Sequence, residues 1–172
     1  YNWQNKYVGI QEAEVDGVHY YFIDNEDYFG GAGVYTSDAR YEVERYAFFC
    51  QAVLSSLPVI GFQPEVIHCH DWQTGLIPVY LKERFANDDF YKGVKSVITI
   101  HNLKFQGKWA IDDVKTMTGL ADYYFTADKL EAYGSANMLK AGLVYADAVT
   151  TVSNTYAEEI KTEFYGEGMD GL

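Results

Sequence analysis

Residues 66–75 read Val-Ile-His-Cys-His-Asp-Trp-Gln-Thr-Gly. A short β-branched run gives way there to two histidines, an aspartate and a tryptophan before a new apolar segment begins. Short apolar runs bounded by such residues are typical of buried strands. We therefore expect a buried strand that delivers polar side chains to a cleft.

The same pattern returns twice along the chain. Residues 94–100 (Val-Lys-Ser-Val-Ile-Thr-Ile) predict a second, mostly buried strand that stops at residues 101–102, His-Asn. Residues 148–152 (Ala-Val-Thr-Thr-Val) predict a third short strand that stops at residues 153–154, Ser-Asn. Each predicted strand therefore ends in side chains that form hydrogen bonds.

Helical patterns separate these strands. After Ser37 and Asp38, either of which can cap a helix, apolar residues recur at helical spacing until Pro58 and Gly61, which we expect to end the helix. A second helix is expected over about residues 74–85, with its apolar stripe facing the core.

The second half of the chain gives weaker signals. Residues 103–133 mix aromatic and acidic residues with glycines, and we expect a long excursion with short helices. Residues 137–146 predict an apolar helix, in which Lys140 would keep its amine at the surface. Thr155 and Glu158 form a capping box that predicts the start of a final helix.

The chain opens differently. Residues 7–15 and 18–23 are β-prone runs joined by Asp16 and Gly17, and an Asp-Gly pair in this setting is a strong sign of a two-residue hairpin. Residues 29–33 (Phe-Gly-Gly-Ala-Gly) lack the glycine order and the Lys-Ser/Thr ending of phosphate-binding loops. We expect a mobile loop there rather than a phosphate site.

Strands that alternate with helices imply βαβ units, and right-handed crossovers make such strands parallel in one sheet. We predict an α/β fold with a doubly wound, mainly parallel sheet, preceded by the hairpin. Ligands gather outside the carboxyl ends of the strands in such sheets. The polar residues after all three strands fall at that edge, so we expect the site there.

Composition sets further bounds. With 172 residues, of which 48% are hydrophobic, the chain can form one well-cored domain. Its formal net charge of −12 would repel phosphate backbones and anionic lipids, so we expect neither nucleic acid nor a membrane as partner. Cys50 and Cys69 lie in apolar segments, as buried free thiols do, which fits a reducing, cytoplasmic setting.

One interpretation of the polar edge is a metal site. His68 and His70 share a strand face while Cys69 points the other way, and with His101 they could bind zinc in a hydrolase. A competent site also needs a carboxylate or more histidines, and the fourth histidine, His19, lies in the distant hairpin. This interpretation is therefore the weaker one.

The other interpretation is a sugar site. His101, Asn102 and Asp71 would hydrogen-bond a polyhydroxylated ligand, and Trp72 would be a flat apolar partner for sugar rings. Simpler roles compete with these: Asp71 could cap the following helix, Trp72 could belong to the core, and His68 is better explained as a hydrogen-bonded structural histidine.

Longer stretches resemble bacterial glycogen synthases and plant starch synthases. Residues 68–78 (HCHDWQTGLIP) resemble their HAHDWHTGLxP segment, and residues 99–107 (TIHNLKFQG) resemble their TxHNLxYQG segment. Residues 139–147, 151–160 and 165–172 resemble further segments in the same order. On these ordered motifs the chain is identified as a member of that family.

The resemblance implies one half of a two-domain GT-B glycosyltransferase, with residues 1–172 as most of its Rossmann-like N-terminal domain. It implies transfer of glucose from ADP-glucose to the non-reducing end of an α-1,4-glucan, with retention at the anomeric carbon and without a metal or other cofactor. ADP-glucose and the glucan would therefore be the partners of the parent enzyme.

The resemblance also implies residue roles. His101 would hydrogen-bond the transferred glucose and stabilise charge at the reacting centre, with Asp71 as the second catalytic residue. Gln73 stands where the family usually has histidine, which keeps a hydrogen-bonding group. The residues expected to bind substrate are Asn102, Trp72, Tyr35, Gln73 and Gln106.

The chain also departs from the family. It begins at Tyr1 rather than Met, and the resemblance leads us to expect that the family's early Lys-Thr-Gly-Gly-Leu loop, its first strand and its donor-binding second domain are not among these residues. We expect the 172-residue chain alone to have negligible synthase activity, and to self-associate or be marginally stable through an exposed sheet edge. The alternatives are a non-catalytic glucan-binding module and, less favoured, the metal-dependent hydrolase.

Overall fold

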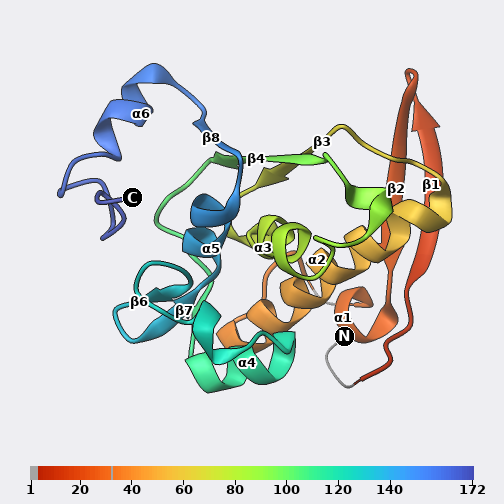
Figure 1. Ribbon diagram of the computed structural model, residues 1–172, viewed down its shortest axis with the longest axis horizontal. Helices are drawn as coiled ribbons and strands as arrows, with labels where there is room; N and C mark the ends of the chain where they lie inside the picture. Colours follow the sequence, from red (N-terminus) through yellow and green to blue (C-terminus); the bar gives the residue numbers. More distant parts are fainter. Residues whose placement is uncertain (1–3, 32) are drawn as a thin grey trace.

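A parallel sheet with helices beneath it forms the centre of the molecule (Figure 1). The structure is a computed structural model that describes residues 4–31 and 33–172. The sheet has the order β3-β4-β8 and consists of β3 (Val66–His70), β4 (Lys95–Ile100) and β8 (Ala148–Thr151). The predicted α/β fold with a parallel sheet and an N-terminal hairpin is confirmed.

The register of the sheet brings the three strand ends together. Residues 66–70 pair in parallel with residues 95–99, and residues 97–100 pair in parallel with residues 148–151. The carboxyl ends of all three strands therefore lie at one edge, and the polar residues that follow them start from neighbouring positions.

Three helices pack together beneath the sheet and supply much of the core: α2 (Ala39–Ile60), α3 (Leu76–Glu83) and α5 (Met138–Tyr145). Asp38 caps α2, because its side chain accepts the backbone N–H of Tyr41 at 3.0 Å. Pro58 lies inside α2, contrary to expectation, and the helix ends two residues later, just before left-handed Gly61. The carbonyl oxygen of Leu54, which Pro58 leaves without a backbone N–H donor, accepts the Tyr91 hydroxyl instead.

Cys50 of α2 and Cys69 of β3 are both buried and free, as the sequence predicts. Burial raises the pKa of the Cys69 thiol to about 12 and that of the Cys50 thiol further still. Both cysteines therefore stay protonated and act as small core residues.

The hairpin stands beside this core (Figure 1) and consists of β1 (Gly9–Val15) and β2 (Val18–Asp24). Asp16 and Gly17 both have positive φ angles, 53° and 79°, as a type I′ turn requires. A short helix that the sequence did not predict, α1 (Glu26–Phe29), follows the hairpin. The expected loop over residues 29–33 includes Ala32, which lies outside the described residues.

The excursion after β4 holds short helices, as expected, and also a small antiparallel sheet that was not predicted. This sheet has the order β5-β7-β6. Its strands and the accompanying helix are β5 (Lys108–Trp109), α4 (Ile111–Thr118), β6 (Glu131–Ala132) and β7 (Ser135–Asn137). The three short 3-10 helices of the described chain are η1 (Trp72–Thr74), η2 (Asp89–Tyr91) and η3 (Asp122–Tyr124).

The prediction that Lys140 keeps its amine at the surface is wrong. The residue is only 7% exposed, and its Nζ donates to the backbone carbonyl oxygens of Ala127 and Glu131. These carbonyls belong to the excursion that folds over α5, so the lysine reaches inward to satisfy them.

The last helix, α6 (Asn154–Glu159), is capped by a different residue than expected. Ser153 Oγ accepts the backbone N–H of Tyr156 at 3.1 Å. The capping box predicted from Thr155 and Glu158 is therefore wrong, because the helix starts before Thr155. None of the helices in the described part is long and apolar enough to cross a lipid bilayer.

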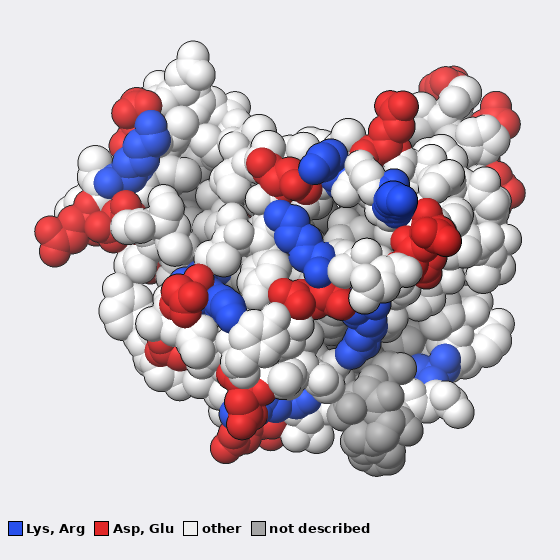
Figure 2. All heavy atoms as spheres, in the orientation of Figure 1, with Lys and Arg blue, Asp and Glu red and all other residues white. Residues whose placement is uncertain are grey.

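Charges of both signs are interspersed on the face shown in Figure 2. Elsewhere in the described chain, Lys82 and Lys95 both lie near the carboxylate of Asp147, at 3.7 and 3.6 Å. Exposed ion pairs of this kind contribute little to stability. On this face the positive charge is spread rather than gathered into one patch.

Two glycines let the start of α3 press against α5. A Cβ atom on Gly75 would lie 2.0 Å from the carbonyl oxygen of Met138, and one on Gly142 would lie 2.4 Å from Cδ1 of Ile98. Neither position has room for a methyl group. The absence of both side chains therefore sets the distance between α5, the start of α3 and the sheet.

We predict that Gly75→Ala lowers the free energy of unfolding by about 2–3 kcal/mol, because the backbone of α5 must move to admit the methyl group. Urea unfolding monitored by circular dichroism measures the loss. Gly171→Ala is the matched control, since a Cβ there meets nothing within 4 Å. Equal stability of the two variants would contradict the prediction.

Candidate active site

The carboxylate of Asp71 joins the ends of β3 and β4. Its Oδ1 accepts the backbone N–H of His101 at 2.7 Å and lies 3.4 Å from the backbone nitrogen of Asn102. Asp71 makes no side-chain capping bond to the helix that follows it, so the capping interpretation is wrong. The structure thus brings together Asp71, His101 and Asn102, as expected from the strand ends.

The backbone of Asp71 has an unusual conformation for a residue with a side chain. Its φ and ψ angles are 56° and −169°, a combination that costs on the order of 1–3 kcal/mol in a non-glycine residue. Its N–H donates to the carbonyl oxygen of Thr99 at 3.0 Å, and Thr74 Oγ1 donates to the carbonyl oxygen of His70 at 2.9 Å. These bonds hold the strained turn and aim the carboxylate at the neighbouring loop.

Three histidines share one face of the sheet edge. His70 Nδ1 lies 3.0 Å from His101 Nε2, so one of these two nitrogens carries the shared proton. The rings of His68 and His70 have centroids 4.3 Å apart. His68 Nε2 contacts Thr99 Oγ1 at 2.6 Å, which agrees with the structural role expected of His68.

His70 was not among the predicted site residues. The sequence grouped it with His68 and His101 only as a possible zinc ligand, and it gave no sign of a direct hydrogen bond between His70 and His101. Burial lowers the pKa of His70, and the neighbouring His68 and His101 lower it further, while Asp71 opposes the shift. His70 is therefore neutral at pH 7 and can accept or donate one hydrogen bond to His101.

Trp72 belongs mainly to the core. Its side chain is 8% exposed and meets the ring of Tyr46 edge to face, with centroids 5.2 Å apart. Gly107 lies against the other side, where a Cβ would come within 2.2 Å of the indole. Trp72 also lines a shallow groove of about 330 Å³ between residues 36–43 and 104–108, so a sugar has partial access to it.

Gln106 is 4% exposed, and its amide bonds only to protein groups. Its Nε2 donates to the carbonyl oxygens of Leu103 and Glu167, both at 3.1 Å, and its Oε1 accepts from Asn137 Nδ2 at 2.7 Å. These contacts favour a role in holding the 103–107 loop rather than direct contact with a ligand.

Tyr35 and Gln73 approach each other near the strand ends, beside residues that line the groove. Tyr35 is 67% exposed, and its hydroxyl lies 3.5 Å from Gln73 Nε2. Asn102 is exposed at the same edge, with its Oδ1 accepting the backbone N–H of Lys104 at 3.1 Å. The predicted substrate-binding residues other than Gln106 therefore keep at least part of their surface accessible.

Within residues 4–31 and 33–172, no three His, Cys, Asp or Glu side chains are grouped so that they could hold a metal ion. His68 and His70 instead bond to Thr99 and His101. The geometry gives the metal-hydrolase alternative no support.

We predict that Asp71→Ala destabilises the protein by about 1–2 kcal/mol, because two backbone N–H groups lose their charged acceptor. Asp71→Asn keeps an acceptor oxygen and should lose less. Urea unfolding gives the stabilities, and the amide resonances of His101 and Asn102 report the local change. Equal losses in both variants, with these resonances unmoved, would show that the carboxylate does not hold the loop.

We also predict a pH effect from His70. Because its pKa is lower in the folded protein, the unfolded chain binds the proton first as the pH falls, so folding loses stability below the ordinary histidine pKa. His70→Gln removes this contribution and should flatten the change in unfolding free energy between pH 7.5 and 5.5. An equally steep or steeper change in the variant would contradict the shift.

Known proteins match the chain along its whole length. The family model for the starch synthase catalytic domain matches residues 1–172. Glycogen synthase of Lachnospira eligens is 65% identical over 170 residues, which cover 99% of this chain and 35% of that protein. Glycogen synthase of Lachnoclostridium phytofermentans is 54% identical over 171 residues, covering 99% and 36%.

A solved structure agrees with these matches. The catalytic domain of starch synthase IV from Arabidopsis thaliana, bound to ADP and acarbose, aligns with a TM-score of 0.85 and 26% identity. The alignment covers 95% of this chain and 34% of that one, and this chain spans about 35% of the length of the curated relatives it matches. Sequence and structure together show that the chain belongs to the starch synthase catalytic domain family.

Proposed function

We propose that the chain is part of a retaining glucosyltransferase that moves glucose from ADP-glucose to the non-reducing end of an α-1,4-glucan. One observation carries the proposal: the Asp71 carboxylate holds His101 and Asn102 together at the sheet edge where such folds bind ligands. The relatives named glycogen synthase and the neighbour bound to ADP and acarbose support the choice of donor and acceptor.

The geometry suggests a different role for each residue. Asp71 fixes the backbone after β4, and His101 presents its imidazole to the transferred glucose. Because His101 Nε2 bonds to His70, Nδ1 is the nitrogen available to a sugar hydroxyl. Groups held in place before the reaction stabilise developing charge without reorganising, which is usually the largest contribution to catalysis.

The remaining predicted residues would shape the sugar site. Tyr35 and Gln73 contact each other and are the sequence neighbours of Thr36 and Trp72, which line the groove, and Asn102 follows His101 on the same loop. Gln106 would act indirectly, because its hydrogen bonds hold that loop in place. In this proposal no metal or other cofactor takes part.

Location and assembly follow from the same proposal. We place the parent enzyme in the cytoplasm, where the two cysteines stay reduced. Self-association of the isolated chain also stays a prediction. Its support is the edge strand β3, which among the described residues pairs only with β4 and carries the half-exposed Val66.

We predict that the full-length polypeptide containing this segment elongates a malto-oligosaccharide from ADP-glucose, while the 172-residue chain alone has negligible activity. His101→Ala in the full-length polypeptide should lower kcat about 100-fold, the usual effect of losing one preorganised group. Release of ADP and the length of the glucan product measure the reaction.

His19→Ala is the matched control, since His19 lies in the hairpin and bonds to Glu12. It should leave the rate unchanged. Glucan binding without glucose transfer by the full-length polypeptide would favour the non-catalytic binding module instead. Measurable elongation by the 172-residue chain would contradict the expected inactivity.

A further inference from the structure

A buried ion pair lies at the start of α2, where neither partner was predicted to matter. Arg45 is 2% exposed, and its Nη2 lies 2.8 Å from Glu42 Oε2. Taking two charges out of water is costly, and such pairs often add no net stability over apolar residues. The groups that this pair binds besides each other therefore indicate its role.

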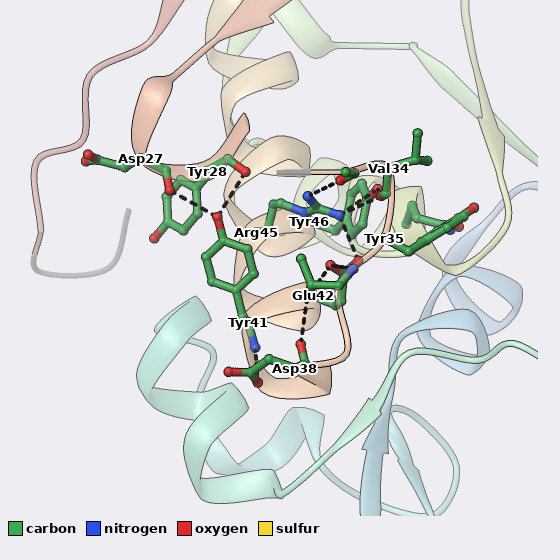
Figure 3. A network of polar contacts seen from close by, with 12 residues as sticks. Asp27, Tyr28, Val34, Tyr35, Asp38, Tyr41, Glu42, Arg45 and Tyr46 are labelled. Atoms are coloured by element: carbon green, nitrogen blue, oxygen red, sulfur yellow. Dashed lines mark hydrogen bonds and ion pairs between the residues drawn. The ribbon is translucent and has the colours of Figure 1, made fainter. Parts of the chain in front are cut away.

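Both partners bind the segment that carries Tyr35, and Figure 3 shows Arg45 and Glu42 beside Val34 and Tyr35. Arg45 donates to the carbonyl oxygen of Val34 at 2.8 Å and to that of Gly33 at 3.4 Å. Glu42 Oε1 accepts both the backbone N–H and the hydroxyl of Thr36, each at 2.9 Å. The residues immediately before and after Tyr35 are thus fixed to one ion pair.

Aromatic rings enclose the guanidinium. Its Cζ lies 4.9 Å from the ring centroid of Tyr46, 5.7 Å from that of Tyr41 and 5.9 Å from that of Phe29. Tyr41 is itself fixed, because its hydroxyl donates to the carbonyl oxygen of Tyr28 at 3.0 Å. These rings exclude water, and the hydrogen bonds that the guanidinium donates are stronger than they would be at the surface.

The side chain between the two anchored residues is mostly exposed. Tyr35 is 67% exposed and extends away from the ion pair (Figure 3), with its hydroxyl near Gln73. Residues 33–38 form neither helix nor strand, so the regular backbone hydrogen bonds of a helix or a sheet do not hold this loop. The position of the Tyr35 ring therefore depends on the ion pair.

We propose that Arg45 and Glu42 are positioning residues that hold Tyr35 beside Gln73 in the proposed sugar site. This inference rests on the proposed function, because it assigns the ring a task in sugar binding. The buried pair would act only through the loop, without contact to the sugar. Its loss should therefore weaken substrate binding more than it slows the chemical step.

Arg45→Lys in the full-length polypeptide tests the proposal. Lysine keeps the charge, but its single ammonium cannot reproduce the planar fork that reaches two carbonyls and Glu42 together. We expect KM for a malto-oligosaccharide to rise about 5–10-fold, with kcat changed less than 2-fold, as expected when binding alone is lost. In a Tyr35→Ala background the same substitution should add almost nothing.

Two further variants separate positioning from general damage. Asp38→Ala removes the cap of the same helix without touching either anchor of Tyr35, so it should lower Tm while leaving KM unchanged. Thr36→Val removes the hydroxyl bonds to Glu42 and to the carbonyl oxygen of Asp38, but it keeps the backbone N–H bond to Glu42 and leaves both buried charges paired. It should raise KM less than Arg45→Lys does, and it serves if that variant fails to fold.

Hydrogen exchange of the full-length polypeptide gives a readout that does not need activity. Faster exchange of the amides of residues 33–36 in Arg45→Lys or Thr36→Val, together with the non-additive KM effect, supports the proposal. Unchanged exchange, or KM effects that add to those of Tyr35→Ala, would overturn it. If the unsubstituted polypeptide transfers no glucose, the proposed function fails, and the exchange result alone decides whether the pair holds the loop.

Discussion

The carboxylate of Asp71 is the contact on which the candidate site depends. Parallel pairing brings the ends of β3 and β4 near each other, but pairing alone leaves the following residues free to diverge. One charged oxygen accepting N–H groups beyond β4 prevents this, and charge-assisted bonds of this kind are among the stronger ones in proteins. The positive φ angle of Asp71 directs that oxygen toward the residues after β4. The strained backbone of Asp71 therefore allows the contact between the two strand ends.

Hydrophobic periodicity predicts most of the architecture, because an element that is buried on one face repeats its apolar residues at the spacing of a helix or a strand. The strands observed at residues 66–70 and 95–100 were found in this way. The capping rule fails at Thr155 because the helix starts earlier, with Ser153 as its cap, and it fails at Asp71 because such rules consider only near neighbours. The true partners of Asp71 lie 30 and 31 positions away, beyond any local pattern.

Buried polar residues were the hardest part to predict. Lys140 and the Glu42–Arg45 pair have the spacing of ordinary surface residues on amphipathic helices. They are buried because loops fold over the helices and present carbonyl oxygens that need donors. The resemblance to a known family named Tyr35, but only the structure reveals what holds it.

The pairing of β4 with β8 has a consequence for the order of folding. Thr99 and Thr150 meet through their hydroxyls at 2.7 Å although 51 positions separate them in the chain. Contacts of such long sequence separation form late, because the entropy of closing the loop must be lost first. During synthesis, α2 and the hairpin can form well before the third strand emerges. A nascent chain therefore contains helices long before it contains a completed sheet edge.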